Sequence, residues 1–157
     1  MTDTEKPYYE TAKRIAPPED AHWWVERTGR RSYLGHNDRG STVLIADSDD
    51  NLPNSFSPGE LLRLALASCA GLTFDNLVAR HLGDDFGATV AVDATPHATE
   101  DRYVSFQEHV LLDTSDLDDA ARTRLADAIA RAISLGCTVG LTLKNGAPFE
   151  LQISPAE

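Results

Sequence analysis

Residues 57–80 read SPGELLRLALASCAGLTFDNLVAR and form the strongest helical signal in the chain. Ser57 can cap the free amides of the first turn, Pro58 suits the first helical position, and Glu60 follows the serine at capping-box spacing. Gly83 is placed to end the helix. Apolar and small residues recur at three- and four-residue spacing and predict one broad buried face: Leu61, Leu62, Ala65, Leu66, Cys69, Leu72 and Thr73.

The chain has two cysteines, and each lies in an informative place. Cys69 sits on the apolar face of this helix among small neighbours, where a free cysteine is most often a buried, hydrophobic thiol. Cys137 comes directly after a second helical segment. If a short helix begins there, its free amides would stabilise a thiolate and lower the pKa of Cys137. Periodicity does not distinguish helix from strand over so short a run.

The rest of the chain alternates between strand and helix signals. Residues 23–34 and 41–46 predict a β-hairpin, with residues 35–40 as its loop. A second long helix is expected over 115–135, capped by Ser115. The other strands expected are 88–94, 103–112, where the alternation slips near Glu108, and 148–153. This order predicts an α+β fold, with two long helices packed against a mostly antiparallel sheet.

Length and charge limit the function. The 157 residues suit one domain, which we place at 21–157 after a charged, proline-bearing arm at 1–20. A net charge of -11 disfavours nucleic-acid and anionic membrane partners. No apolar run is expected to reach membrane-spanning length, and no secretory signal is evident, so the expected location is the cytoplasm. The five histidines and two cysteines show no metal-ligand spacing, and we expect no metal or cofactor.

The two cysteine contexts together resemble a known family. Residues 58–62 (PGELL) and 65–71 (ALASCAG) resemble the first cysteine motif of the OsmC/Ohr family, the osmotically inducible and organic hydroperoxide resistance proteins. Residues 137–139 (CTV) and 142–143 (TL) resemble the second. The resemblance extends from about Trp23 to Ile153.

This resemblance implies an intertwined homodimer with thiol peroxidase activity on organic hydroperoxides. Cys69 would attack the peroxide as a thiolate and become a sulfenic acid, and Cys137 would condense with it to a disulfide. A dithiol such as dihydrolipoamide would then reduce the disulfide. An apolar pocket would suit an alkyl or lipid-like peroxide, and its expected walls are Leu62, Leu66, Leu72 and Phe74.

The chain departs from the family pattern at the acidic partner of the thiol. Hydroperoxide resistance members carry a glutamate directly after the motif proline, where this chain has Gly59, and the glutamate follows one place later as Glu60. Glu60 can take the catalytic role or serve only the helix cap. The family also uses an arginine from the first hairpin to hold the thiolate. Arg39 is the best match, with Arg30 and Arg31 as alternatives.

Two other functions remain open at this point. Gly59 in the glutamate position favours a non-catalytic protein of the same family that binds an apolar small molecule. The presence of both cysteines also fits a redox sensor, whose disulfide would change its affinity for a partner. Turnover with a dithiol would separate the peroxidase from both alternatives.

Overall fold

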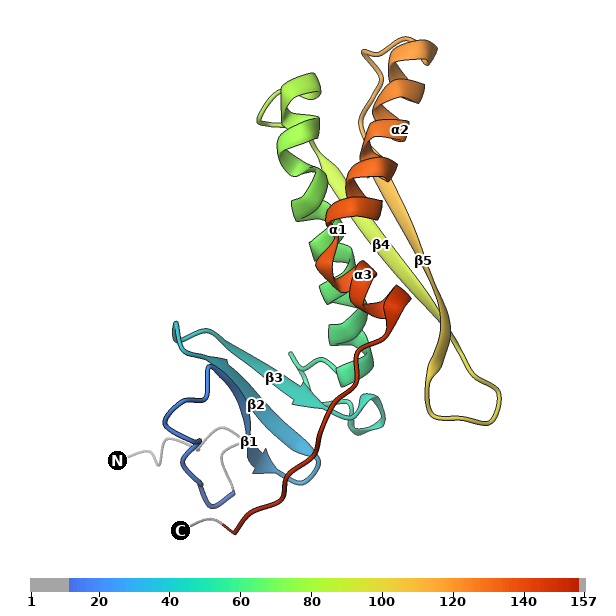
Figure 1. The fold of residues 1–157 in the computed structure, drawn as a ribbon. Helices are drawn as coiled ribbons and strands as arrows, with labels where there is room; N and C mark the ends of the chain where they lie inside the picture. The colour runs from blue at the N-terminus through green and yellow to red at the C-terminus, as the bar shows by residue number, and fades with distance from the viewer. Residues whose placement is uncertain (1–11, 156–157) are drawn as a thin grey trace. The chain divides into compact units, whose positions relative to one another are not determined.

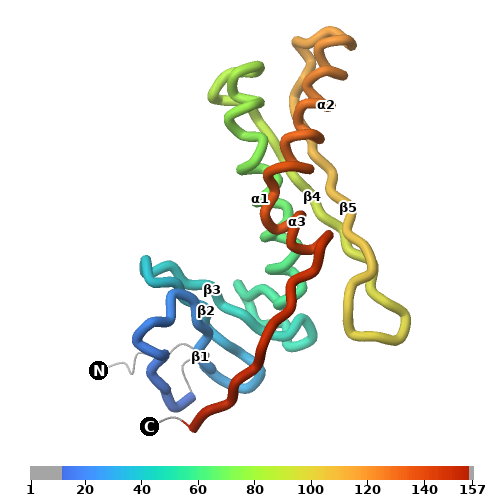
Figure 2. Tube along the Cα trace, in the orientation of Figure 1, coloured from blue at the N-terminus to red at the C-terminus, as the bar shows by residue number. Residues whose placement is uncertain are grey.

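The computed structural model describes residues 12–155, which belong to two compact units (Figures 1 and 2). One unit comprises the chain up to Leu61 together with the C-terminal segment from Gln152, and the other comprises Leu62–Leu151. The architecture is α+β, with antiparallel sheets and helices, as predicted. The proposed boundary between an arm at 1–20 and a single domain at 21–157 stays a prediction.

The first unit contains a three-stranded antiparallel sheet in the order β1 (Trp23–Gly29), β2 (Ser32–Asn37) and β3 (Thr42–Ala46). The single strand expected over 23–34 is wrong, because the chain reverses between β1 and β2, where Arg31 takes a φ of 52°. The loop expected at 35–40 is shorter, since β2 continues to Asn37. The Asn37 side-chain oxygen accepts hydrogen bonds from the amides of Arg39 and Ser41, both at 3.0 Å.

The described end of the N-terminal arm lies against this sheet. The amide of Ala12 donates to the Thr28 carbonyl at 3.1 Å, and Arg14 lies 3.5 Å from Glu26. Residues 1–11 of the expected arm lie outside the described residues. After β3 the chain makes a short 3-10 helix, η1 (Ser48–Asp50), and reaches the long helix α1 (Pro58–Leu82).

Both ends of α1 form as the sequence predicts. The Ser57 amide donates to Glu60 Oε2 at 2.7 Å, and the Glu60 amide donates to Ser57 Oγ at 3.3 Å, which is a capping box. At the other end Gly83 has a φ of 94°, and its amide donates to the Ala79 carbonyl at 2.9 Å. A left-handed glycine in this position is a common helix C-cap.

The buried face of α1 differs from the predicted one. Its buried residues are Leu66, Ala67, Ala70, Phe74 and Val78. Leu72 was expected on the buried face and is 79% exposed. The helix is apolar on nearly every side, so spacing alone does not single out the face that packs.

The hydrophobicity of α1 also corrects the expectation that no apolar run reaches membrane-spanning length. By length and composition α1 could cross a membrane, but the core helix of a globular fold meets the same two criteria. Phe74 and Val78 of α1 pack into the core of the second unit, at 1% and 0% exposure. This packing buries only part of α1, since 28% of its most apolar stretch lies inside the structure.

The second unit places helices along a two-stranded antiparallel ribbon, β4 (Ala88–Pro96) and β5 (Tyr103–Leu112). Helix α2 (Asp119–Gly136) is followed at once by the short helix α3 (Thr138–Asn145). Figure 1 shows α1 and α2 lying along the ribbon. Residues from α1, α2, β4 and β5 share one core, with these members among others: Phe74, Val78, Val90, Val110, Leu125 and Ile129.

Two boundaries in this region differ from the sequence predictions. Helix α2 is capped by Asp118, whose carboxylate accepts from the Ala121 amide at 2.7 Å, because Ser115 bonds to the Asp113 carboxylate instead. The strand expected over 148–153 is absent from the described structure, where residues 146–155 have no regular structure. No strand of the described structure pairs with this segment, and its side chains Phe149 and Ile153 are 91% and 88% exposed.

The left-handed cap of α1 gives a stability prediction. Gly83→Ala should lower the free energy of unfolding by about 1 kcal/mol, because a Cβ is disfavoured at positive φ. Its Cβ would also lie 3.2 Å from Asp85 Oδ1. Gly87→Ala is the matched control, since a Cβ there meets nothing within 4 Å. Urea unfolding measures both variants, and equal stability of the two would contradict this role for Gly83.

Candidate functional site

The structure brings the two cysteines together in the second unit. Cys69 lies on α1 and is half-buried, whereas Cys137 lies between α2 and α3 and is 1% exposed. Both are free thiols, and the Cys69 side chain lies near enough to the Cys137 thiol to raise the pKa of Cys137. Two residues that are 68 positions apart in the sequence therefore meet at one point, as the redox-pair interpretation of the sequence requires.

A close approach of α2 to α1 makes this contact possible. A Cβ added to Gly136 would lie 3.1 Å from Thr73 Cγ2, tighter than most real contacts, so a glycine fits the end of α2 closely against α1. Thr73 lies one turn after Cys69 and donates its hydroxyl to the Cys69 carbonyl at 2.6 Å. Gly136 therefore allows Cys137 to lie close to the part of α1 that carries Cys69.

Cys137 is also the N-cap of α3. Its Sγ accepts a hydrogen bond from the Gly140 amide at 3.3 Å, the place where a Ser or Asp oxygen usually serves. A Cβ at position 140 would lie 3.2 Å from this sulfur and 3.6 Å from Leu66 Cδ1. Gly140 therefore leaves the sulfur close to the backbone and to the Leu66 side chain.

The pKa of Cys137 contradicts the expectation from its position at a helix start. Burial raises the pKa of Cys137 above its usual value, and this effect is larger than the opposing hydrogen bond from the Gly140 amide. The neighbouring Cys69 thiol and the Glu108 carboxylate raise the pKa of Cys137 further. Cys137 is thus held as a protonated thiol, and a helix terminus alone does not make it reactive.

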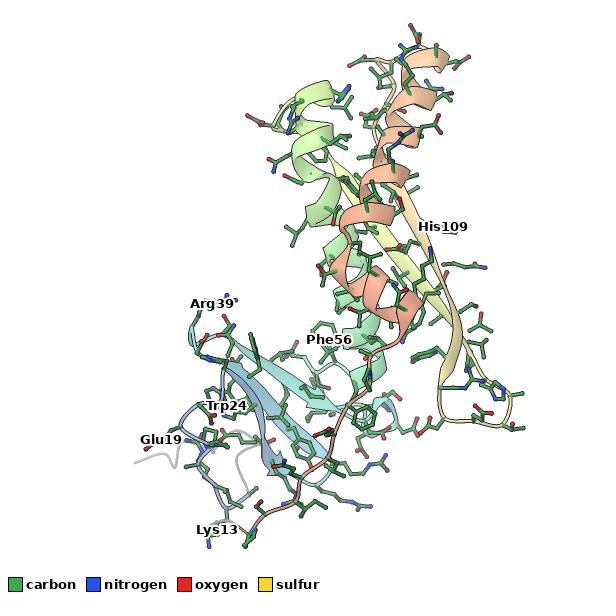
Figure 3. The ribbon with its side chains drawn as sticks, in the orientation of Figure 1. Lys13, Glu19, Trp24, Arg39, Phe56 and His109 are labelled. Carbon is green, nitrogen blue, oxygen red and sulfur yellow. The ribbon has the colours of Figure 1, made fainter. Side chains whose placement is uncertain are left out.

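Glu108 is the residue of this site that sequence reasoning missed. The alternation of β5 does not slip near Glu108, because Phe106, Glu108, Val110 and Leu112 all occupy its less exposed face. The irregularity lies at the start of the strand, between Tyr103 and Ser105. Residues such as His109 lie on the exposed face (Figure 3). Burial raises the pKa of Glu108. The signal in the sequence was a charged residue at an inward position of an otherwise regular strand.

A cavity of about 420 Å³ lies beside the thiol pair, on the side of β5 and α3. Its walls combine apolar and polar side chains: Leu66, Tyr103, Val104, Phe106, Glu108, Gly140, Leu143 and Lys144. The pocket expected from Leu62, Leu66, Leu72 and Phe74 does not form as one site. Leu66 lines this cavity, while Leu72 and Phe74 line a separate hollow against β4.

The other candidate site residues belong to the first unit. Arg39 is exposed in the turn between β2 and β3 (Figure 3), and Arg30 is exposed in the turn before β2. Arg31 forms ion pairs with Asp47 and, at 3.8 Å, with Asp50. Glu60 takes part in the capping box of α1. The action of Arg39 or Glu60 on the thiols stays a prediction.

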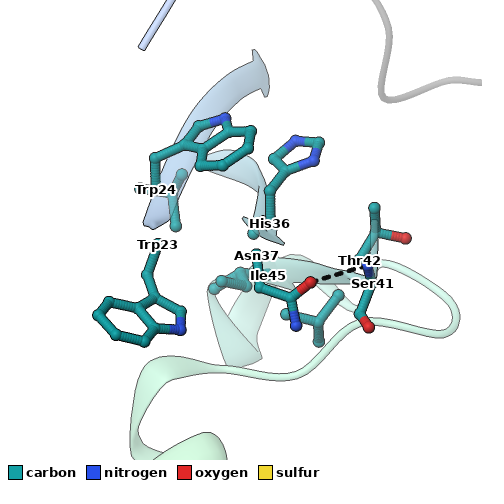
Figure 4. Close-up of a pocket in the computed structure, with 10 residues that line it drawn as sticks. Trp23, Trp24, His36, Asn37, Ser41, Thr42 and Ile45 are labelled. Atoms are coloured by element: carbon teal, nitrogen blue, oxygen red, sulfur yellow. Dashed lines mark hydrogen bonds between the residues drawn. The ribbon is translucent and has the colours of Figure 1, made fainter. Parts of the chain in front are cut away.

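The first unit has a hollow of its own, of about 540 Å³, on the face of its sheet (Figure 4). Trp24 and His36 stack there, with ring centroids 5.0 Å apart and an interplanar angle of 7°. His36 Nε2 lies 3.3 Å from Glu26 Oε1, although the geometry is not that of a hydrogen bond. Within residues 12–155, no three His, Cys, Asp or Glu side chains gather into a possible metal site.

Comparison with known proteins gives a family and several relatives. The model of the family of OsmC-like proteins matches residues 48–152. An uncharacterized protein of Mycobacterium tuberculosis is 44% identical over 130 residues, which cover 83% of this chain and 93% of that protein. An uncharacterized protein of Mycobacterium bovis matches to the same extent.

Solved structures share the fold at low sequence identity. An OsmC like protein from Mycoplasma pneumoniae aligns with a TM-score of 0.54 and 14% identity, over 81% of this chain and 90% of that chain. The organic hydroperoxide resistance protein OhrB of Bacillus subtilis aligns with a TM-score of 0.50 and 17% identity, over 78% and 91%. At these identities the likeness extends to the fold alone.

The raised pKa of Cys137 predicts its alkylation behaviour. In the folded protein, the pH at which its alkylation rate is half-maximal should be higher than in the urea-unfolded chain, because burial favours the neutral thiol. Peptide mass spectrometry after timed iodoacetamide labelling measures the alkylation of Cys137 separately from that of Cys69. The comparison uses the midpoint pH, so slow access of the reagent does not affect it. A midpoint at or below that of the unfolded chain would contradict the role of burial.

Proposed function

Because the chain belongs to the family of OsmC-like proteins, we propose that it is a thiol-dependent peroxidase that reduces organic hydroperoxides. A peroxidase or redox-related role is what this family supports, and the contact between Cys69 and Cys137 carries the proposal to this chain. The Cys69 thiol is half-buried and accessible, and the Cys137 thiol is fully buried beside it. This division suits an attacking and a resolving cysteine.

The proposed reaction has three steps. The Cys69 thiolate attacks the outer peroxide oxygen, the O–O bond breaks, and the products are Cys69 sulfenic acid and, after protonation, an alcohol. The Cys137 sulfur then displaces the sulfenic oxygen, forming the Cys69–Cys137 disulfide and water. A dithiol of the dihydrolipoamide type reduces this disulfide and is itself oxidised to a disulfide. These thiols and the dithiol reductant suit a reducing cytoplasm.

Arg39 is the residue we propose to hold the Cys69 thiolate and the departing oxyanion. It is exposed in its turn and makes no ion pair with the described residues, whereas Arg31 is engaged by Asp47 and Asp50. Arg30 is the remaining alternative. Glu60 is the candidate acidic partner of the thiol. To take that role, its carboxylate would have to give up its hydrogen bond to the Ser57 amide. Helix capping is therefore the role we favour for Glu60.

A ligand-binding function is the second candidate, and one cavity favours it. A hollow of about 530 Å³ between β5 and α2 is walled mainly by aliphatic side chains, including Val110, Leu125 and Ile129. An apolar small molecule would fit such a site. The absence of a glutamate at Gly59 is consistent with this alternative. A redox-sensing role would use the same thiol pair without turnover.

The oxidation of the thiols tests the peroxidase. One equivalent of cumene hydroperoxide should convert the reduced protein to a Cys69–Cys137 disulfide, seen by intact and peptide mass. Cys69→Ser should leave the peroxide unconsumed. Cys137→Ser should consume one equivalent and stop at a sulfenic acid that dimedone traps. Arg39→Ala should slow the oxidation of Cys69 about a hundredfold, as loss of an oxyanion partner does, with Arg30→Ala as the control.

Three results would count against these assignments. Unchanged thiols in the wild type would favour the ligand-binding candidate. Peroxide consumption by Cys69→Ser at the wild-type rate would show that Cys69 is not the nucleophile. Equal slowing by Arg39→Ala and Arg30→Ala would show that the choice of arginine is wrong.

A homodimer is the assembly we propose. Large apolar side chains are exposed on three elements of the second unit, at 79% for Leu72 on α1, 61% for Leu111 on β5 and 75% for Leu135 on α2. Exposed apolar surface of this kind typically marks a protein interface. Sedimentation velocity at micromolar concentration should give twice the chain mass of 17.1 kDa. A single species at the chain mass would contradict the dimer.

A further inference from the structure

We propose that Glu108 accepts the proton of Cys137 when this thiol attacks oxidised Cys69. This inference rests on the proposed peroxidase function and adds a residue to its second step. It concerns the carboxylate of Glu108 on β5, a different residue from Glu60 and from the hairpin arginines.

The first observation is an unsatisfied buried oxygen. Glu108 Oε1 is shielded from solvent and has no hydrogen-bond partner among the described residues. An unpaired buried carboxyl costs folding free energy, and polar groups of this kind call for a structural or chemical reason. The residue pairs with Val92 of β4 on the inward face of the ribbon, where an aliphatic side chain would pack without this cost.

The second observation is the position of Glu108 relative to Cys137. The negative charge of Glu108 is one of the causes that raise the pKa of the Cys137 thiol. Glu108 and Gly140 both line the cavity of about 420 Å³, and the Gly140 amide donates to the Cys137 sulfur at 3.3 Å. This volume has room for water, so a proton can pass over one or two hydrogen bonds.

The third observation is the protonation state of both groups. Burial raises the pKa of Cys137, so the resolving sulfur begins as a thiol and must lose a proton as it attacks. Burial also raises the pKa of Glu108 above its usual value, in the direction of neutral pH. Proton transfer is most effective when the pKa of the base is close to the working pH.

The step balances within the site. The Cys137 S–H proton moves to the Glu108 carboxylate while the Cys137 sulfur bonds to the Cys69 sulfur. The S–O bond of the sulfenic acid breaks, and the leaving hydroxide takes the proton from Glu108, so the products are a disulfide and water. Glu108 returns to its starting state, and no further oxidant or reductant takes part.

Other titratable groups around Glu108 affect how this step depends on pH. Cys137 interacts with Glu108 from the helix side. Glu108 lines two cavities, which it shares with Tyr103 and Lys144 in one and with Arg122 of α2 in the other. Lys144 is exposed and forms no ion pair with Glu108 within the described structure, so the carboxylate is not neutralised by a fixed partner.

The test separates the two chemical steps in a single turnover. Reduced protein is mixed with one equivalent of cumene hydroperoxide, quenched with dimedone at set times and analysed by peptide mass. In Glu108→Gln, Cys69 should be oxidised at the wild-type rate, while the disulfide forms about a hundredfold more slowly and dimedone-trapped sulfenic acid accumulates. Asp93→Asn is the matched control, a carboxylate on the exposed face of β4 in the same ribbon.

The pH profile distinguishes proton transfer from a structural effect. In the wild type, disulfide formation should rise with pH through the titration of Glu108 and then level off. In Glu108→Gln it should rise with the Cys137 thiolate and approach the wild-type rate only at high pH. Glu108→Asp keeps the carboxyl and should restore part of the rate, which also serves if the glutamine variant does not fold.

The outcomes separate this inference from the function on which it rests. If wild-type Cys69 is not oxidised, the peroxidase proposal fails. If Cys69 is oxidised but Glu108→Gln forms the disulfide at the wild-type rate, the peroxidase stands and Glu108 is not its proton acceptor. Slowing by the same factor at every pH would also overturn the inference, because it would indicate displaced thiols and not a lost base.

Discussion

The contact between Cys69 and Cys137 is the interaction on which the proposed chemistry of this protein depends. It is a tertiary contact, made because the end of α2 approaches α1 closely at Gly136. The packing of Phe74 and Val78 against Leu125 and Ile129 holds these same two helices together at the core. The same core residues that stabilise the second unit therefore also help to position the two thiols.

Burial and backbone amides compete at Cys137, and their balance assigns the roles of the two thiols. The Gly140 amide favours the thiolate, but the loss of solvent around a residue that is 1% exposed favours the thiol by more. In the proposed reaction, a buried and protonated sulfur would be protected from peroxide until Cys69 has been oxidised. The half-buried Cys69 is the sulfur that an incoming hydroperoxide can reach first.

Local signals in the sequence predicted local structure well. The capping box at Ser57 and Glu60, the glycine end of α1 and the bounds of β5 needed only neighbouring residues, and the structure confirms them. The buried face of α1 could not be chosen, because a helix that is apolar all round fits a core in several orientations. Ser115 and Asp118 were both chemically suitable caps, and a competing bond to Asp113 decided between them.

The candidate site was predictable in its cysteines and not in its surroundings. Two motifs at helix positions indicated the pair, whereas the direction of the Cys137 pKa depends on how deeply the fold buries it. Glu108 looked like an irregularity in β5, because the sequence does not show which face of a two-stranded ribbon the helices cover.

The sulfur that caps α3 links redox chemistry to helix stability. A Ser or Asp oxygen that caps a helix takes no part in disulfide formation. In α3 the acceptor for the Gly140 amide is instead the Cys137 sulfur, the atom that would bond to Cys69. Any reaction that turns Cys137 Sγ toward its partner must leave this amide to find another acceptor, such as water. The first turn of α3 therefore shares one atom with the thiol pair, so the proposed disulfide would weaken the cap of this helix.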